Sequence, residues 1–361
     1  MVNESTLREG LKMSYMSPEQ FIDEICSKNH ILQRICIEVT YRCNERCKHC
    51  YVFDEKKLVD EELSVEQYFK LFDDLFKMGT LHITFTGGDP SQRQDFTKIL
   101  RGAVERGFVV TIFTNGTGYS KNTLDEIISI RPAMIGFSVY SGIPEEHDEI
   151  TGIKGSFKKT LATLKKVKST GIMITVKTPV MAPTLNGLPA IKALCKELDV
   201  RSEISYFICA TNHGNISPTK LRLGSVEKYK QVMQLNRDEN FFDDFQPRDI
   251  HDKICGAGRI SLSVNPYGEV FPCNGFSYRL GNIKDTPISE IWNGEALHNL
   301  YQLKFENLGD KCVNCQWRDD CTYCLGSSLA ENGNIFIPIE ENCKIARANY
   351  EFRLENLPRN F

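Results

Sequence analysis

The chain has 361 residues, of which 41% are hydrophobic and 25% charged, and its formal net charge is −3. That length suits one large domain plus a smaller one, and the weak charge gives no reason to expect nucleic-acid or membrane-surface binding. We expect neither a signal peptide nor a membrane span. With 14 cysteines and no secretion signal, we expect a cytoplasmic protein whose cysteines bind metal rather than form disulfides.

The first 34 residues form a leader segment that is too short to be a domain. Within it, Pro18–Ile25 has the pattern of a short helix. Its apolar residues, Phe21, Ile22 and Ile25, are predicted to face inward. The pattern suggests no functional role for this leader.

Strand-like and helix-like segments alternate from residue 35 to residue 240, which we take as the first domain. Strands are expected at Ile35–Thr40, Leu81–Thr86, Phe108–Thr114, Met134–Val139, Ile172–Thr178 and Glu203–Ile208. Helices are expected near Ser64–Lys77, Phe96–Arg106, Lys121–Ile130, Ser156–Lys168 and Leu188–Leu198. Repeated strand–helix units predict parallel strands with right-handed crossovers. We therefore expect an α/β fold, a partial TIM-like (β/α)6 barrel whose chemistry gathers at the C-terminal ends of the strands.

Three cysteines follow the first expected strand at C-x3-C-x2-C spacing: Cys43, Cys47 and Cys50. Three thiolates on one tight loop can hold three corners of a 4Fe–4S cube, which leaves one iron for a substrate or cofactor. A closed structural site would normally supply four protein ligands, and only His49 lies among these cysteines. A zinc knuckle or a redox-sensing cysteine group is the alternative.

This spacing, followed by the aromatic Tyr51, resembles the radical S-adenosylmethionine (radical SAM) superfamily. The resemblance implies that the open iron binds the amino and carboxylate groups of the methionine moiety. An electron from the cluster then cleaves the sulfonium and releases a 5′-deoxyadenosyl radical. The resemblance also implies a partial barrel and an electron donor such as flavodoxin or ferredoxin.

A Gly-Gly-Asp-Pro segment, Gly87–Pro90, stands at the end of the second expected strand. Gly87 and Gly88 permit close backbone approach to a ligand, and Asp89 offers an anion to an ammonium group. The segment resembles the G-G-E-P motif of the family, whose backbone groups bind the methionine amino group, with Asp in place of Glu. Further cofactor contacts are implied by position in the family at Tyr51, Asn115, Ser138 and Lys159.

A loop rich in turn-forming residues, Cys209–Pro218, follows the sixth expected strand. If six strands form the barrel, this loop lies over its mouth. Cys209 is therefore a candidate catalytic residue that donates a hydrogen atom to a substrate radical. An unreactive loop cysteine is the alternative.

The C-terminal region, residues 241–361, is expected to form a small cysteine-rich domain. Its seven cysteines are Cys255, Cys273, Cys312, Cys315, Cys321, Cys324 and Cys343. The segment before Cys273 predicts two strands joined by a Pro-Tyr-Gly-Glu turn. This pattern resembles the SPASM extension of the radical SAM superfamily, which carries two auxiliary 4Fe–4S clusters, although Cys321 and Cys324 are one residue closer than usual. One or two zinc ions in a ribbon-like module are the alternative.

The SPASM resemblance implies how these cysteines are shared between the two clusters. One cluster would be enclosed by Cys312, Cys315, Cys321 and Cys343. The other would be held by Cys255, Cys273 and Cys324, and would be open or completed by a non-cysteine ligand. An open iron there could bind a substrate thiolate or amide, or the cluster could carry away an electron.

Together these patterns predict an enzyme that abstracts hydrogen from a peptide or protein substrate. The leading hypothesis is a thioether or carbon–carbon crosslink in a ribosomally made peptide. Alternatives within the class are a sulfatase-type formylglycine maturase, a peptide epimerase and a small-alcohol dehydrogenase. The alternative from another class is a non-catalytic zinc or iron–sulfur scaffold protein.

Overall fold

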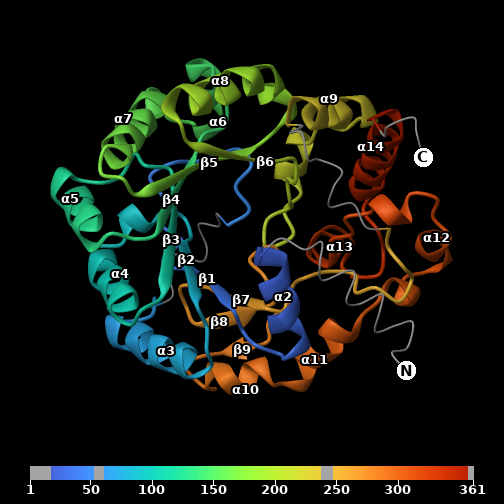
Figure 1. Ribbon diagram of the computed structural model, residues 1–361, viewed down its shortest axis with the longest axis horizontal. Helices are drawn as coiled ribbons and strands as arrows, with labels where there is room; N and C mark the ends of the chain where they lie inside the picture. Colours follow the sequence, from blue (N-terminus) through green and yellow to red (C-terminus); the bar gives the residue numbers. More distant parts are fainter. Residues whose placement is uncertain (1–17, 53–60, 237–246, 357–361) are drawn as a thin grey trace.

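The computed structural model describes residues 18–52, 61–236 and 247–356 (Figure 1). Its sheet has nine strands in the order β6-β5-β4-β3-β2-β1-β7-β8-β9. Neighbouring strands from β6 to β7 are parallel, as repeated strand–helix units require. The first six strands are β1 (Arg34–Glu38), β2 (His82–Thr86), β3 (Val109–Thr114), β4 (Met134–Ser138), β5 (Met173–Pro179) and β6 (Arg201–Ser205).

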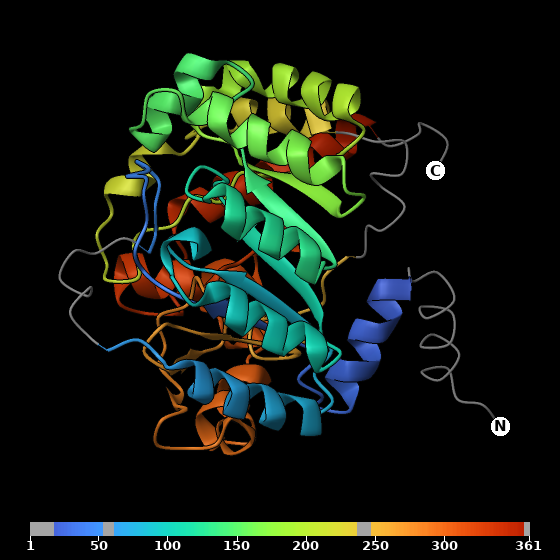
Figure 2. The same ribbon diagram turned by 90° about the vertical axis from the view of Figure 1, so that its left-hand side faces the viewer.

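A ring of helices covers the outer face of the six strands (Figures 1 and 2). These helices are α3 (Val65–Lys77), α4 (Phe96–Glu105), α5 (Lys121–Ile130), α6 (Pro144–Thr151), α7 (Ser156–Lys168) and α8 (Leu188–Leu198). Ser64 with Gln67 three residues later predicts a capping box at the start of α3, and the structure confirms it. The Ser64 hydroxyl accepts from the Gln67 backbone, and the Gln67 side chain accepts from the Ser64 backbone. The partial (β/α)6 barrel is therefore confirmed.

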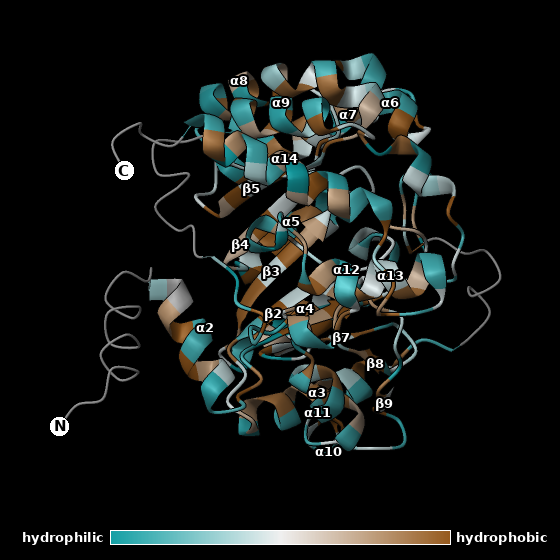
Figure 3. Ribbon diagram, turned by 90° about the vertical axis from the view of Figure 1, so that its right-hand side faces the viewer, coloured by the Kyte–Doolittle hydropathy of each residue, from teal (hydrophilic) through white to brown (hydrophobic). Residues whose placement is uncertain are grey.

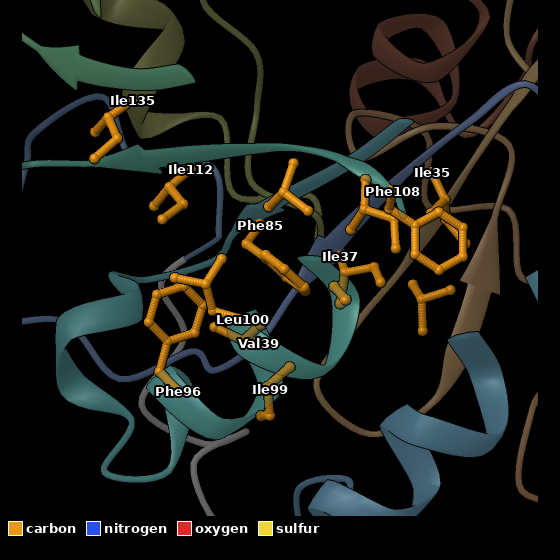
Figure 4. Packing of buried hydrophobic residues seen from close by; sticks show 14 of the residues in the cluster. Ile35, Ile37, Val39, Phe85, Phe96, Ile99, Leu100, Phe108, Ile112 and Ile135 are labelled. Atoms are coloured by element: carbon orange, nitrogen blue, oxygen red, sulfur yellow. The ribbon is translucent and has the colours of Figure 1, made fainter. Parts of the chain in front are cut away.

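Alternation along each strand separates the core from the interior of the barrel. Ile35, Ile37 and Phe85 point outward and are completely or almost completely buried against the helices (Figure 4). The opposite face carries polar side chains in register, with Ser138 paired to Lys177 and Lys177 paired to Glu203. The same period of two thus builds an apolar core outside the sheet and a polar chamber inside it.

Strand β6 ends at Ser205, three residues before the predicted end. The Ser205 carbonyl accepts a hydrogen bond from the Val180 backbone, and Tyr206 then turns to pack edge-on against Tyr229 of α9 (Val226–Asn236). Because the chain leaves the sheet early, Phe207 and the residues after it cross the mouth of the barrel instead of extending the strand.

The C-terminal region continues the barrel sheet. The predicted hairpin is confirmed as β7 (Ser261–Val264) and β8 (Glu269–Phe271), followed by β9 (Gly281–Asn282). The sequence did not indicate that β7 pairs in parallel with β1. The remaining helices are α10 (Ile288–Trp292), α11 (Glu295–Gln302), α12 (Asp310–Val313), α13 (Leu325–Asn332) and α14 (Glu340–Asn356).

Side-chain hydrogen bonds and ion pairs tie this region to the barrel, and the two predicted domains share one sheet. The Arg222 guanidinium makes a bidentate ion pair with Glu331 on α13, and the Tyr229 hydroxyl donates to Glu341 on α14. The sequence near 241–249 predicts a linker between the two regions, and most of that stretch lies outside the described residues. In the described ranges no helix combines the length and apolarity needed to cross a bilayer.

The prediction for the leader helix is wrong in one respect. Helix α2 (Pro18–Lys28) forms, but Phe21, Ile22 and Ile25 are 38%, 45% and 37% exposed. The helix contacts the rest of the protein through Cys26, which is buried, and through Ser27, whose hydroxyl accepts from Arg259. Figure 3 shows the brown, apolar stretches of α2 at the margin of the molecule, away from the strands.

Candidate active site

A cavity of about 740 Å³ opens at the C-terminal ends of the parallel strands. Its walls come from the cysteine loop, the ends of β2 to β6, the segment Phe207–Cys209 and the pair Asn274 and Gly275. The volume is in the range of small-molecule and cofactor sites. The position is the one at which barrel enzymes place their chemistry.

Cys43, Cys47 and Cys50 all line this cavity. Backbone bonds from Arg46 to Thr151 and from Lys48 to Ile150 fasten the loop to α6. The Cys50 backbone N–H donates to the Cys47 carbonyl at 3.1 Å, which closes the turn between the second and third cysteine. The structure therefore brings the three predicted loop ligands to one wall of one chamber.

Burial favours the protonated form of Cys43 and Cys47 by raising the pKa of each thiol. Burial raises the pKa of Cys43 to about 12, and the nearby Asp89 carboxylate adds to the rise. The pKa of Cys47 is also raised, by burial first and then by the charges of Glu45 and Cys50. Binding to iron would release these protons, because a metal stabilises the thiolate form.

The described residues contain no group of three or more His, Cys, Asp or Glu side chains already gathered about a single metal ion. In a cubane each thiolate binds a different iron, so its thiolates stand farther apart than the ligands of one ion. Three half-buried thiols facing a shared chamber are the donor set that such a cluster requires, and the residues present fit it.

The two glycines of the Gly-Gly-Asp-Pro segment are required by the cysteine loop itself. A Cβ atom on Gly87 or on Gly88 would lie 2.3 Å from the carbonyl oxygen of Thr40 or Arg42, respectively. Gly87 also has a φ of +133°, which disfavours any side chain. The Gly88 N–H donates to the Thr40 carbonyl at 2.7 Å. The close backbone approach expected at these glycines is therefore a contact with the backbone of Thr40 and Arg42.

Asp89 is buried, and neighbouring groups engage both of its carboxylate oxygens. Oδ1 accepts from the Ser91 backbone at 2.9 Å, while Oδ2 accepts from the Thr114 hydroxyl at 2.8 Å and the Asn115 backbone at 2.7 Å. Burial raises its pKa, and these hydrogen bonds oppose that rise. The side chain joins the ends of β2 and β3, which leaves the predicted ammonium contact a prediction.

The other predicted cofactor contacts divide into two groups. Tyr51, Asn115 and Ser138 line the cavity. The Asn115 side-chain amide lies 3.8 Å from the Cys43 sulfur and donates to Asn44 at 2.9 Å. Lys159 is exposed on α7, and the structure does not bring it to the cavity.

Tyr51 also connects the cysteine loop to the C-terminal region. Its hydroxyl donates to buried Glu38 at 3.4 Å and accepts from the Asn274 side chain at 2.9 Å. Burial raises the pKa of Glu38 to about 7, and hydrogen bonds from Tyr41 and Tyr51 limit the rise. Tyr51, the aromatic residue after the third cysteine, therefore links the cysteine loop to the C-terminal region through hydrogen bonds.

Several cavity residues were missed by reasoning from the sequence. Glu45 accepts from Thr117 at 3.1 Å, and burial raises its pKa to about 7. Tyr140 lies 3.8 Å from the Cys47 sulfur. Its place two residues beyond Ser138, on the same strand face, was a usable signal.

An ion pair on the wall of the cavity was also missed. Lys177 Nζ donates to Glu203 at 2.6 Å and lies 4.1 Å above the centre of the Phe113 ring. Each residue alone resembles an ordinary charge near a strand end. Only the register between β5 and β6 brings them together.

The structure brings the C-terminal cysteines together in two groups, and their ligand roles stay a prediction. In the first, burial raises the pKa of Cys321 to about 12, Arg248 opposes the rise, and nearby thiols add to it: Cys343, Cys312 and Cys315. In the second, burial raises the pKa of Cys273 to about 12, and the neighbouring thiols Cys255, Cys324 and Cys209 add to the rise. The second group thus includes a cysteine from the barrel. Cys209 also lines the cavity.

A partial barrel with a thiol-lined chamber at its strand ends is the architecture of an α/β barrel enzyme. The family model of the radical SAM superfamily matches residues 37–195, and that of the SPASM iron–sulfur cluster-binding domain matches residues 255–316. The chain belongs to the radical SAM superfamily, carries a SPASM domain and is a radical SAM enzyme. Its cofactors are S-adenosylmethionine, a 4Fe–4S cluster and auxiliary iron–sulfur.

Similar proteins act on different kinds of substrate. The chain is 28% identical to the antilisterial bacteriocin subtilosin biosynthesis protein AlbA of Bacillus subtilis, over 82% of this chain and 67% of AlbA. It is 24% identical to an AdoMet-dependent heme synthase of Methanosarcina barkeri, over 83% of this chain and 93% of the synthase. The structure of Streptococcus suis SuiB bound to its precursor peptide SuiA shares the fold, with a TM-score of 0.68 and 14% identity. The match covers 95% of this chain and 82% of SuiB.

Proposed function

We propose that this radical SAM enzyme abstracts hydrogen from a peptide or protein and installs an oxidative modification. The leading product is a thioether or carbon–carbon crosslink in a ribosomally made peptide. Two findings support a peptide substrate: AlbA is named as a bacteriocin biosynthesis protein, and SuiB was solved with a precursor peptide. A reducing cytoplasm suits this chemistry, with flavodoxin or ferredoxin as the electron donor.

Cys43, Cys47 and Cys50 are the proposed ligands of the cluster that cleaves S-adenosylmethionine. When bound, the cluster supplies the electron that converts the cofactor to methionine and a 5′-deoxyadenosyl radical. The protein holds the three thiols on a loop that Gly87 and Gly88 fix by backbone packing. This fixed loop and the enclosing chamber orient the cofactor and keep water from the radical.

Cofactor binding is proposed for Tyr51, Asn115, Ser138 and the backbone of Gly87–Asp89. All of them line the cavity. The Asp89 carboxylate is proposed to position this segment, because its oxygens already accept hydrogen bonds from β3 and from Ser91. Lys159 has no proposed contact, since it is exposed on α7.

The C-terminal region is proposed to hold two auxiliary 4Fe–4S clusters. One ligand set is Cys312, Cys315, Cys321 and Cys343, and the other contains Cys255, Cys273 and Cys324. Their task is to accept the electron left when a substrate radical closes to product. We retain the domain boundaries 1–34, 35–240 and 241–361 as proposals.

The observation that carries this proposal is the placement of three loop thiols on the wall of one chamber at the strand ends. Anaerobically reconstituted protein should contain about twelve irons, as three cubes require. With reductant it should form 5′-deoxyadenosine. Cys43→Ala should abolish that product. Cys195→Ala should retain it, because this buried cysteine lies on α8, outside the three groups. Product formation by Cys43→Ala at the wild-type rate would contradict the assignment.

The modification itself is read from the mass of a candidate peptide co-expressed with the enzyme. Loss of two hydrogens indicates a crosslink or, in a sulfatase, formylglycine formation, and fragmentation of the peptide separates the two. Unchanged mass with deuterium uptake indicates epimerisation. A small-alcohol dehydrogenase would leave the peptide unmodified.

Membership in an enzyme superfamily counts against a non-catalytic scaffold.

A tetrapyrrole is the second candidate substrate. The similarity to AdoMet-dependent heme synthase favours it, because that relative is covered over 93% of its length. Titration of the reconstituted protein with an iron porphyrin, followed by its visible absorbance, tests this candidate. A saturable shift of the porphyrin absorbance that is lost when a cavity residue is substituted would favour a porphyrin over a peptide.

A further inference from the structure

The second group of C-terminal cysteines has only three members within its own region. Cys255 lies before β7, Cys273 follows β8, and Cys324 caps the N-terminus of α13. The Cys324 sulfur accepts the backbone N–H of Ser327 at 3.4 Å. A 4Fe–4S cube has four irons, so three thiolates leave one iron without a protein ligand.

Cys209 reaches this group from the barrel. Its sulfur lies 3.6 Å from the Ser327 hydroxyl, in the same first turn of α13 whose backbone N–H bonds the Cys324 sulfur. The two sulfurs therefore flank one residue.

The segment that carries Cys209 is fastened on both sides. The Ile208 carbonyl accepts from the Arg222 guanidinium at 2.8 Å, and the same guanidinium makes the bidentate ion pair with Glu331 at the end of α13. The Asn212 backbone donates to the Tyr51 carbonyl at 2.9 Å. A part-buried charge pair thus holds the segment of Cys209 against α13, at the wall of the cavity.

Cys36 is the other barrel thiol near this group. It lies on β1, and its neighbours include Cys273 and the Ser263 hydroxyl, to which it is hydrogen-bonded across the sheet. Its place within the paired strands β1 and β7 fixes its direction, whereas Cys209 stands on a loop beside Cys324. Cys36 is therefore the rival ligand that an experiment has to separate from Cys209.

We propose that Cys209 is the fourth thiolate ligand of the auxiliary cluster held by Cys255, Cys273 and Cys324. This inference rests on the proposed function for the existence of that cluster. Ligation releases the thiol proton to solvent and changes no oxidation state. It leaves this cluster no open iron for substrate, so the cluster accepts electrons without binding the peptide. It also removes Cys209 as a hydrogen-atom donor, because a ligated thiolate has no hydrogen to give.

The test uses the full chain with Cys43, Cys47 and Cys50 changed to alanine, so that only the auxiliary clusters remain. This background should hold about eight irons, and added Cys209→Ala should lower the count by about one and produce a 3Fe–4S electron paramagnetic resonance signal. Cys209→Ser should keep the iron but show an altered spectrum, since a serine oxygen can replace the thiolate. Cys195→Ala, the matched control for loss of a buried cysteine, should change neither.

A probe for an open iron gives a second measurement. ¹³C-labelled cyanide added to the reduced background protein should show no hyperfine coupling when Cys209 is present. It should give a coupled signal in the Cys209→Ala variant after excess ferrous iron has restored the fourth iron of its cluster. Unchanged iron and spectra in Cys209→Ala would overturn the inference, as would loss of iron from Cys36→Ala instead. Wild-type protein with full auxiliary clusters that forms no 5′-deoxyadenosine would overturn the proposed function and leave this inference standing.

Discussion

The cysteine loop and the C-terminal region use the same side chain in opposite ways. The loop places Cys43, Cys47 and Cys50 within one short stretch, and all three face a chamber shared with polar strand ends. The seven C-terminal cysteines come from distant segments. Four of them, Cys255, Cys273, Cys312 and Cys321, pack against an apolar cluster that includes Phe276 and Phe305. Ligands from one loop can cover only one side of a cluster, whereas ligands from several segments can enclose it. The contrast fits the proposed roles, a reacting cluster at the loop and electron-accepting clusters in the C-terminal region.

The largest effect that separates the two regions is expected from Cys312→Ala. Because this thiol belongs to the group away from the chamber, the variant should still cleave S-adenosylmethionine at close to the wild-type rate. Peptide modification should fall to background, since the electron from the product radical has no route out. The two rates are measured in one assay as 5′-deoxyadenosine and modified peptide. Equal loss of both products in Cys312→Ala would mean that cofactor cleavage and peptide modification do not depend on separate regions.

An intermediate effect is expected from Gly88→Ala, which tests how the loop is held. The new Cβ would lie 2.3 Å from the Arg42 carbonyl oxygen, so the backbone of the loop has to move. We expect a loss of about 1–3 kcal/mol in stability and faster loss of the loop cluster on exposure to air. Thermal unfolding and iron release report the two effects.

Gly309→Ala is the matched control for Gly88→Ala. Gly309 has an ordinary φ of −60°, and a Cβ there would meet no atom within 4 Å. Its substitution should cost less than about 1 kcal/mol, the scale of a changed helix cap. If Gly309→Ala destabilised the protein as much as Gly88→Ala, the close packing of the loop would not be the reason for the glycines.

The sequence predicted the barrel and the cysteine loop because both depend on local pattern. Strand alternation, helix periodicity and three closely spaced cysteines are all visible within short windows. The exposed face of α2 was missed because apolar spacing indicates a helix but not whether anything covers it. The buried face of α2 is decided by tertiary contacts, namely the burial of Cys26 and the hydrogen bond from Arg259 to Ser27.

The features that the sequence did not reveal depend on contacts between distant segments. Lys177 and Glu203 meet only through the register of β5 and β6. Cys209 approaches Cys324 only because β6 ends at Ser205 and the chain turns toward α13. No local pattern encodes either pairing, and both lie at or near the cavity, where function places the strongest demands on geometry.

The smallest effect is expected from Ser138→Ala and Lys159→Ala, which test the cofactor contacts implied by the family pattern. Ser138 lines the chamber in register with Lys177, so losing its hydroxyl should raise the KM for S-adenosylmethionine about 2- to 10-fold, the value of one hydrogen bond. Lys159 is exposed on the outer face of α7, so Lys159→Ala should leave KM unchanged. Steady-state formation of 5′-deoxyadenosine at varied cofactor concentration measures both. A larger effect from Lys159 than from Ser138 would place the cofactor outside the chamber, and the contrast between a reactive barrel site and closed C-terminal sites would lose its basis.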